Sequence, residues 1–195
     1  MGMSDVSPRP GYKVTPCPAN LIPRYETGKQ EVLWIGCSDS GFEETTVLDM
    51  PLEQTLVVRD IANMALPEDT AAASGVQYAV DVLKVRHVVV CGHYECDVVK
   101  AVDQRRGLHG PWFSKIQELR AVSTPALQAV DQEHRDGRFV ELNVVEQMKQ
   151  VQKFPEIKRA MEERGLRIHG LVYSRTWNKA VKIELPGEER DWLNG

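Results

Sequence analysis

Three short apolar runs, residues 31–37, 55–59 and 86–92, limit what this chain can form. Short runs rich in aliphatic and β-branched residues are typical of strands buried on both faces of a sheet. Between the second and third runs, a segment that starts near Pro67 carries apolar residues at helical spacing. The order strand, helix, strand predicts parallel pairing, with ligands bound beyond the carboxyl ends of the strands.

The second half of the chain is rich in helix formers between residues 111 and 164. We expect helices near residues 113–121, 124–135, 140–152 and 155–164, and we expect them to cover the sheet. Residues 166–173 and 180–185, which flank a polar stretch, predict a terminal hairpin.

Residues 1–24 carry five of the chain's prolines, at a density that argues against regular structure. We therefore expect an N-terminal arm over residues 1–24, lying on the body or on a partner, and one domain over residues 25–195. A chain of 195 residues is long enough for such a domain to bury a core without disulfides.

Charge and composition exclude several classes of function. The net charge is -4 and no block of basic residues occurs, so a nucleic-acid surface is not expected. No run of about 18 apolar residues predicts a membrane span, and the first residues lack the apolar core of a secretory signal. Four unevenly spaced cysteines fit a reducing compartment, so we expect a cytoplasmic protein whose cysteines serve packing or metal binding.

Four potential metal ligands follow two of the predicted strands. Cys37 and Asp39 come at the end of the first run, and His93 and Cys96 come directly after the third. Zinc accepts cysteine sulfur, histidine nitrogen and aspartate oxygen in a tetrahedron, and three protein ligands with one labile position are typical of a catalytic site. The pattern therefore predicts a zinc site at the edge of the sheet.

Each of these residues also has an ordinary structural interpretation. Cys37 and Cys96 can pack as small hydrophobic side chains, and His93 can be a hydrogen-bonded loop histidine. Asp39, which precedes Ser-Gly, can cap a turn or a helix. We expect Cys91, inside a strand, to belong to the core.

Several segments together resemble the β-class carbonic anhydrases. They are Leu-Trp-Ile-Gly-Cys-Ser-Asp-Ser (33–40), Arg-Asp-Ile-Ala-Asn (59–63), Gln-Tyr-Ala-Val-Asp-Val-Leu (77–83) and Cys-Gly-His-Tyr-Glu-Cys (91–96), followed by residues 141–147 and 168–173. The likeness begins near residue 25 and covers nearly the whole domain in one order.

The resemblance implies an α/β fold with a mainly parallel sheet flanked by helices, and one Zn²⁺ per chain held by Cys37, His93 and Cys96. It also implies reversible hydration of CO2 to bicarbonate, with water activated by the metal. Homodimers with an embracing N-terminal segment, often paired as a dimer of dimers, are the implied assembly.

The largest departure from the family is at Gly41. Family members usually have Cys-Ser-Asp-Ser-Arg, where the arginine pairs with the aspartate and draws it off the metal. Such a pair at 4 Å is worth on the order of 4 kcal/mol at an effective dielectric near 20, before desolvation costs. Without it, we predict that Asp39 becomes the fourth zinc ligand and that activity falls roughly ten- to hundred-fold. The alternative is that a water or an anion fills the space at Gly41.

Two further departures concern charge near the metal. Glu95 and Asp97 stand where the family commonly has glycines, and their charges would oppose formation of hydroxide unless both side chains point to solvent. Asp60 replaces the usual asparagine and could simply be a hydrogen-bonding variant.

Trp34, Arg59 and Tyr173 match positions at which some family members hold bicarbonate in a noncatalytic pocket. The structural alternative is that the two aromatic residues belong to the core and that Arg59 forms an ion pair.

The leading hypothesis is therefore a zinc-dependent carbonic anhydrase of low activity, with CO2 and bicarbonate as its partners and Asp39 and Gly41 deciding its rate. One alternative is an inactive zinc protein that binds bicarbonate or a partner. Another is a hydrolase of CS2 or COS. No proton-transfer residue is identified, and His87, at the start of a strand, is expected to be structural.

Overall fold

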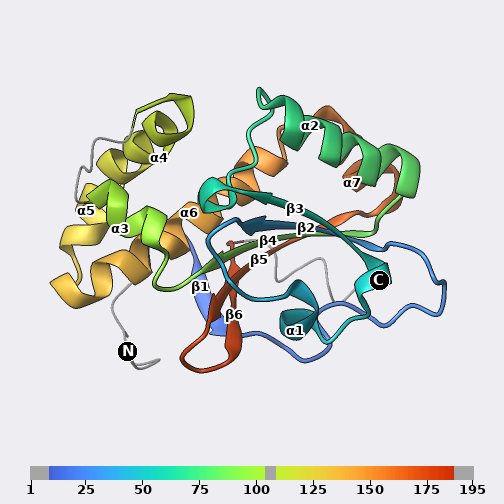
Figure 1. Ribbon diagram of the computed structural model, residues 1–195, viewed down its shortest axis with the longest axis horizontal. Coiled ribbons are helices and arrows are strands. Elements are labelled where there is room, and N and C mark those ends of the chain that lie inside the picture. The colour runs from blue at the N-terminus through green and yellow to red at the C-terminus, as the bar shows by residue number, and fades with distance from the viewer. Residues whose placement is uncertain (1–8, 104–108, 187–195) are drawn as a thin grey trace.

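The computed structural model describes residues 9–103 and 109–186. Its six strands form one sheet in the order β1-β6-β5-β4-β2-β3 (Figure 1). The strands are β1 (Lys13–Pro16), β2 (Val32–Cys37), β3 (Thr55–Asp60), β4 (His87–His93), β5 (Arg167–Ser174) and β6 (Lys179–Glu184). The four strands β3, β2, β4 and β5 are parallel, as predicted from the strand, helix, strand order.

The predicted terminal hairpin is confirmed, because β5 and β6 pair in antiparallel fashion. Residues 1–8 lie outside the described ranges, and for residues 9–24 the prediction that they lack regular structure is wrong. Residues 13–16 form β1, which pairs with β6 at the edge of the sheet. Pro16 is tolerated because an edge strand has one side on which no ladder hydrogen bond is needed. The domain boundary after residue 24 stays a prediction.

Seven α-helices surround the described part of the sheet. They are α1 (Glu44–Leu48), α2 (Thr70–Gln77), α3 (Asp97–Asp103), α4 (Pro111–Val122), α5 (Thr124–Gln128), α6 (Arg135–Val151) and α7 (Pro155–Arg164). The helices predicted near residues 113–121 and 155–164 are confirmed. The one predicted over 124–135 ends early at Gln128, where Arg135 Nε donates to the carbonyls of Leu127 and Val130. The helix predicted near residues 140–152 is confirmed as α6, which begins earlier, at Arg135.

Both faces of the central strands are buried. In β2, Leu33 and Ile35 belong to a large core under the helices, whereas Val32 and Trp34 belong to a smaller core on the opposite face. Helices α2 and α7 lie together over one part of the sheet, and α3, α4 and α5 gather at one end of α6 (Figure 1). This two-sided burial explains why the strands read as continuous apolar runs.

Helix α6 lies very close to β4 and β5 because glycines face it. A Cβ added at Gly92 would lie 2.9 Å from Val144 Cγ2, and one at Gly170 would meet Met148. Helix α6 also holds the segment after β3, since Asn143 Nδ2 donates to the Ala62 carbonyl at 2.8 Å. The carboxyl end of β4 is thus fixed by direct helix packing.

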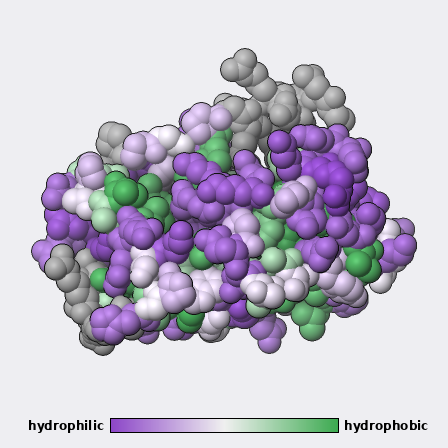
Figure 2. Space-filling view, turned by 90° about the horizontal axis from the view of Figure 1, so that it is seen from above, coloured by the Kyte–Doolittle hydropathy of each residue, from purple (hydrophilic) through white to green (hydrophobic). Residues whose placement is uncertain are grey.

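The side of the molecule on which α2 and α4 lie is mostly hydrophilic, with hydrophobic side chains in small groups (Figure 2). Large exposed hydrophobic residues in the described ranges are Leu52, Tyr78, Val82, Val122 and Met161. Scattered apolar side chains of this kind are normal at protein surfaces. None of the described helices combines the length and the apolar character needed to cross a bilayer.

A buried histidine pair lies at the amino ends of β4 and β5. The two rings meet at 3.0 Å between His87 Nδ1 and His169 Nε2, and His87 Nε2 lies 2.7 Å from the Tyr25 hydroxyl. Burial, with smaller contributions from nearby arginines, lowers the pKa of His87 to about 4. Burial and the neighbouring His87 lower the pKa of His169 to about 3. His87 is therefore a structural residue, as predicted.

This pair should make the fold sensitive to acid. The unfolded chain takes up protons near pH 6.5, whereas the folded histidines stay neutral until about pH 4 and about pH 3. Stability is therefore full above pH 6.5 and is lost as the pH falls through this window, by up to about 2.7 kcal/mol per pH unit for two groups. Urea unfolding at a series of pH values should show this slope, and His87→Gln should reduce it by about half. An equal slope in the variant would contradict the assignment.

Candidate metal centre

The strand register brings the predicted ligands to one edge of the sheet. Gly36 of β2 pairs with Cys91 of β4, so Cys37 lies level with the residue that precedes His93. The carboxyl ends of parallel strands meet at the same edge, and loops there commonly carry binding sites. Cys96 follows in the short loop between β4 and α3.

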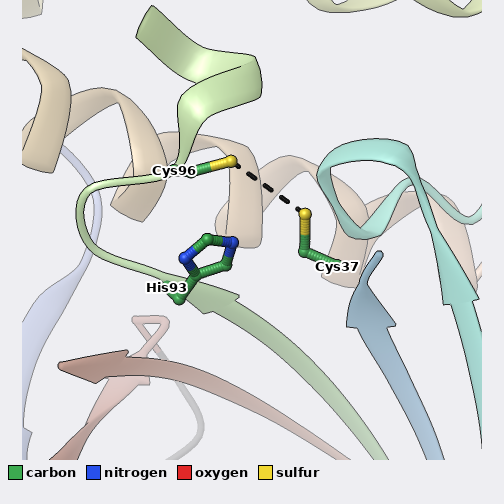
Figure 3. A group of neighbouring side chains, drawn as sticks. All are labelled: Cys37, His93 and Cys96. Carbon is green, nitrogen blue, oxygen red and sulfur yellow. Dashed lines mark hydrogen bonds between the residues drawn. The ribbon is translucent and has the colours of Figure 1, made fainter. Parts of the chain in front are cut away.

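Cys37, His93 and Cys96 converge beyond this edge (Figure 3). The two sulfurs lie 4.0 Å apart, and one ligand atom from each of the three residues lies within 4.8 Å of the others. All three side chains are buried. Cys37 and Cys96 extend the large core, whereas the His93 ring faces Phe42 on the other side of the sheet at 6.3 Å.

This arrangement fits a zinc ion. Two sulfurs bound to tetrahedral zinc at about 2.3 Å lie roughly 3.8 Å apart, close to the 4.0 Å found here. His93 Nε2 is buried without a hydrogen-bond partner in the described chain, and an unpaired buried nitrogen is costly unless it has a ligand. His93 Nδ1 lies 3.3 Å from the Tyr94 carbonyl, a contact that orients the ring and leaves Nε2 to the metal.

The two cysteines influence each other's protonation. The hydrogen bond from Cys96, helped by His93, lowers the pKa of Cys37 and favours its thiolate. The same hydrogen bond and the resulting charge raise the pKa of Cys96. The hydrogen bond thus favours a thiolate at Cys37, and a bound cation would favour loss of the proton from Cys96 as well.

Asp39 lies beside the cluster but is held by the backbone. Its Oδ2 accepts a hydrogen bond from the Asp97 N–H at 2.8 Å, and its own N–H donates to Cys37 Sγ at 3.4 Å. It does not belong to the group of three converging ligand atoms. Asp39 as the fourth zinc ligand therefore stays a prediction.

Gly41 adopts a φ of +63°, which favours glycine, and a Cβ there would lie 3.2 Å from Arg175 Nη1. The space where the family carries an arginine side chain is thus bordered by the guanidinium of a distant residue. Sequence spacing gives no signal for this contact, because Arg175 lies in the turn of the terminal hairpin.

The acidic residues of the β4–α3 loop point outward. Glu95 and Asp97 are both exposed, Glu95 accepts from Thr176 Oγ1 at 3.4 Å, and Asp97 pairs with Lys100 at 2.9 Å. The Lys100 hydrogen bond is the largest cause of a lowered pKa at Asp97, to which the Arg175 charge also contributes. The carboxylates of Glu95 and Asp97 therefore face solvent, which was one of the two alternatives expected from the sequence. Asp60 Oδ1 accepts from the Ile61 N–H at 3.0 Å, as expected for a hydrogen-bonding variant.

Arg59 organises the loop that follows Cys37. Its guanidinium donates to the Cys37 carbonyl, the Ser40 hydroxyl and the Phe42 carbonyl, and it pairs with Glu44 at 2.6 Å. Glu44 has only 8% of its side chain exposed, so this ion pair is largely shielded. Arg59 thus forms an ion pair, which was the structural alternative to a role in bicarbonate binding.

Trp34 and Tyr173 are buried on the same face of the sheet and contact a common neighbour. The ring of Phe42 lies 4.3 Å from that of Tyr173 and 6.5 Å from that of Trp34. Phe42 and Glu44 thus line the place predicted for noncatalytic bicarbonate, where binding of that anion stays a prediction. No motif in the sequence singled out Glu44 for this position.

A second network behind His93 was not expected from the sequence. The buried carboxylate of Glu141 on α6 accepts hydrogen bonds from Tyr94 at 3.0 Å, Tyr12 at 2.9 Å and Arg9 at 2.9 Å. Burial, followed by the Glu141 charge, raises the pKa of both tyrosines, so both remain hydrogen-bond donors. This carboxylate ties the metal loop to α6 and to the N-terminal segment.

The fold and this site define an α/β protein with a candidate metal centre at the carboxyl edge of a parallel sheet. Residues 32–178 match the protein-family model described as carbonic anhydrase. The chain belongs to the carbonic anhydrase family, and its similarities to solved structures place it in the β class.

Relatives agree in sequence and in structure. A carbonic anhydrase of Emericella nidulans is 36% identical over 163 residues, which are 80% of this chain and 72% of that protein. The structure of the wild-type β-carbonic anhydrase CafD of Aspergillus fumigatus is 33% identical, with a TM-score of 0.77 over 87% of this chain and 98% of that chain. A tetrameric β-carbonic anhydrase of Sordaria macrospora is 34% identical, with a TM-score of 0.71 over 78% of this chain and 80% of that one.

Removal of one ligand should abolish metal binding. We expect the wild type to retain one zinc per chain after dialysis and Cys96→Ser to lose it, since a hydroxyl is a far weaker zinc ligand than a thiolate. Cys91→Ser is the matched control, because Cys91 is a buried cysteine outside the cluster whose sulfur donates to the Gly92 carbonyl. Elemental analysis of the three proteins measures the effect. Equal zinc in wild type and Cys96→Ser would contradict the site.

The loop geometry predicts a stabilising substitution. Glu95 has a φ of +65°, in the left-handed region that costs most residues about 1–2 kcal/mol. Glu95→Gly relieves this strain but makes the unfolded chain more flexible, so we expect the free energy of unfolding to rise by about 0.5–1 kcal/mol. Glu95→Ala removes the charge and keeps the strain, and should not stabilise. Denaturant unfolding of both variants separates the two effects.

Proposed function

We propose that the protein catalyses the reversible hydration of CO2 to bicarbonate with one zinc ion held by Cys37, His93 and Cys96. The observation that carries the proposal is the convergence of these three buried side chains in a chain of the carbonic anhydrase family. When bound, zinc supplies a Lewis acid that makes water a nucleophile at neutral pH.

The side chains around the cluster have separate tasks in this proposal. Cys37 and Cys96 supply negative charge that holds the cation, and the Tyr94 carbonyl fixes the His93 ring. Arg59 keeps the loop after Cys37 in place through its hydrogen bonds to Ser40 and Phe42. Three protein ligands on a tetrahedral zinc would leave one position, for which water and Asp39 would compete.

Low activity is part of the proposal. No cation lies within ion-pair distance of the Asp39 carboxylate in residues 9–103 and 109–186, so the direct pairing of the family's arginine is missing. Within the described residues, the carboxylate accepts a hydrogen bond from the Asp97 N–H, which holds it away from the cluster. A backbone hydrogen bond to a charged group contributes less free energy than a close, poorly exposed ion pair. Movement of Asp39 onto the metal therefore costs less in this chain than in a relative that has the arginine.

The proposed assembly is a homo-oligomer. The Sordaria macrospora relatives are described as tetrameric, and this chain aligns with 80% of one of them. A dimer and a dimer of dimers are distinguished by light scattering. A cytoplasmic location stays a prediction from composition.

Stopped-flow CO2 hydration tests the function. We expect the wild type to accelerate hydration, Cys91→Ser to match it, and Cys96→Ser to fall to the buffer rate because the metal is lost. The wild-type kcat should lie roughly ten- to hundred-fold below that of a relative with the arginine after Cys-Ser-Asp-Ser. A rate equal to that relative's would overturn the low-activity part of the proposal.

Two other outcomes correspond to the alternative functions. Zinc-loaded protein without any acceleration of CO2 hydration would indicate a non-catalytic protein that binds bicarbonate or a partner. Turnover of CS2 or COS without CO2 hydration would indicate a hydrolase of those substrates. Either result would overturn carbonic anhydrase activity.

A further inference from the structure

The turn between β5 and β6 lies across both loops that carry the metal ligands. Its Thr176 hydroxyl donates to Glu95 at 3.4 Å, and its Trp177 ring packs at 6.0 Å against Tyr94, next to His93. On the other loop, Arg175 Nη1 would lie 3.2 Å from a Cβ added at Gly41. One turn thus contacts the Cys37 loop and the His93 loop at once.

The lack of a side chain at position 41 leaves room for the Arg175 guanidinium. The φ of +63° is disfavoured for residues with a side chain, and a Cβ would take the space next to the guanidinium. Arg175 is exposed, as is Gly41, so the contact lies at the mouth of the cluster. A positive charge is therefore placed against the metal loop by a residue far along the chain.

The charged groups near Arg175 determine which of them it can attract. Asp39 Oδ2 is bonded to the Asp97 N–H, and the carboxylate of Asp97 lies within electrostatic range of Arg175. Arg59 also contacts the Cys37 loop, but its donors are engaged by Glu44 and by loop oxygens. Lys100 is paired with Asp97. Arg175 makes no such ion pair within the described ranges, and its charge faces the loop.

We propose that Arg175 is a positioning residue of the metal centre. Its guanidinium attracts the Asp39 carboxylate toward the Asp97 N–H and away from the three ligands, which keeps one coordination position open to a small anion. The proposal rests on the proposed function only in taking Cys37, His93 and Cys96 as metal ligands. It assigns to the β5–β6 turn part of the role that an arginine at position 41 would have.

The size of the effect follows from exposure. Exposed charge pairs are screened by water and salt, so their contribution is small compared with that of a buried pair. We expect loss of the Arg175 charge to weaken anion binding about two- to fivefold, which corresponds to a typical exposed pair. High ionic strength should reduce the difference further.

Azide titration of the cobalt(II)-substituted protein tests this without relying on turnover. Visible absorption reports azide entering the coordination sphere of the metal. We expect Arg175→Gln to bind azide about two- to fivefold more weakly than the wild type, and Arg175→Lys to regain most of the loss. Lys179→Gln is the matched control, because it removes one exposed positive charge from the start of β6 in the same hairpin. It should bind azide like the wild type.

A double-mutant cycle separates positioning from direct attraction of the anion. Asp39→Asn keeps an oxygen for the Asp97 N–H but loses the negative charge, so Arg175→Gln should have no further effect in that background. A loss of azide affinity that persists in the Asp39→Asn background would overturn the positioning role. Equal azide affinity of wild type and Arg175→Gln would overturn it as well.

The outcomes also distinguish this proposal from the proposed function. If the wild type hydrates no CO2 but azide binding depends on Arg175 through Asp39, the function fails and the role of Arg175 stands. If CO2 hydration is measured but azide binding is indifferent to Arg175, the role of Arg175 fails and the function stands.

Discussion

Parallel hydrogen bonding between β2 and β4 determines where the candidate metal ligands meet. The register that pairs Gly36 with Cys91 places Cys37 and His93 at the same edge of the sheet. A slip by one residue would turn every side chain of a strand to the opposite face. Because both faces of these strands are buried in different cores, such a slip would be strongly unfavourable. The strand register therefore fixes the positions of the residues in the site.

Helix α6 supports the same edge from behind. It approaches the end of β4 through Gly92, and its Glu141 carboxylate accepts hydrogen bonds from Tyr94 and from the N-terminal Tyr12. Several donors offset the desolvation of this buried carboxylate, so the network links the N-terminal segment to the metal loop. The residue next to His93 is thereby held independently of any metal.

In the proposed function, electrostatic competition around Asp39 is a second determinant of activity. The Asp39 N–H donates to Cys37 Sγ, whereas its carboxylate accepts a hydrogen bond from a backbone N–H on the other loop. Nearby cations would decide whether the Asp39 carboxylate stays on the Asp97 N–H or binds the metal, and Gly41 has no charged side chain. The exposed guanidinium of Arg175 lies beside this glycine. Its charge, which solvent screens, takes the place of the arginine that family members carry next to the aspartate.

Much of the site could be predicted from residue type and order. Cys37, His93 and Cys96 follow strand-like apolar runs, and their chemistry points to zinc. The parallel strands and the terminal hairpin were predictable because hydrophobic periodicity and turn residues are local signals. The strand at residues 13–16 was not, since it depends on an edge offered by β6 rather than on its own proline-rich sequence.

The sequence by itself determined the candidate ligand set, the strand order along the chain and the absence of an arginine at position 41. Only the tertiary structure decided which groups surround those ligands. Arg175 meets Gly41, Glu44 meets Arg59 and Glu141 meets Tyr94 across long stretches of chain. Such contacts arise from the packing of loops and helices on the sheet. The spacing of residues along the chain does not predict them.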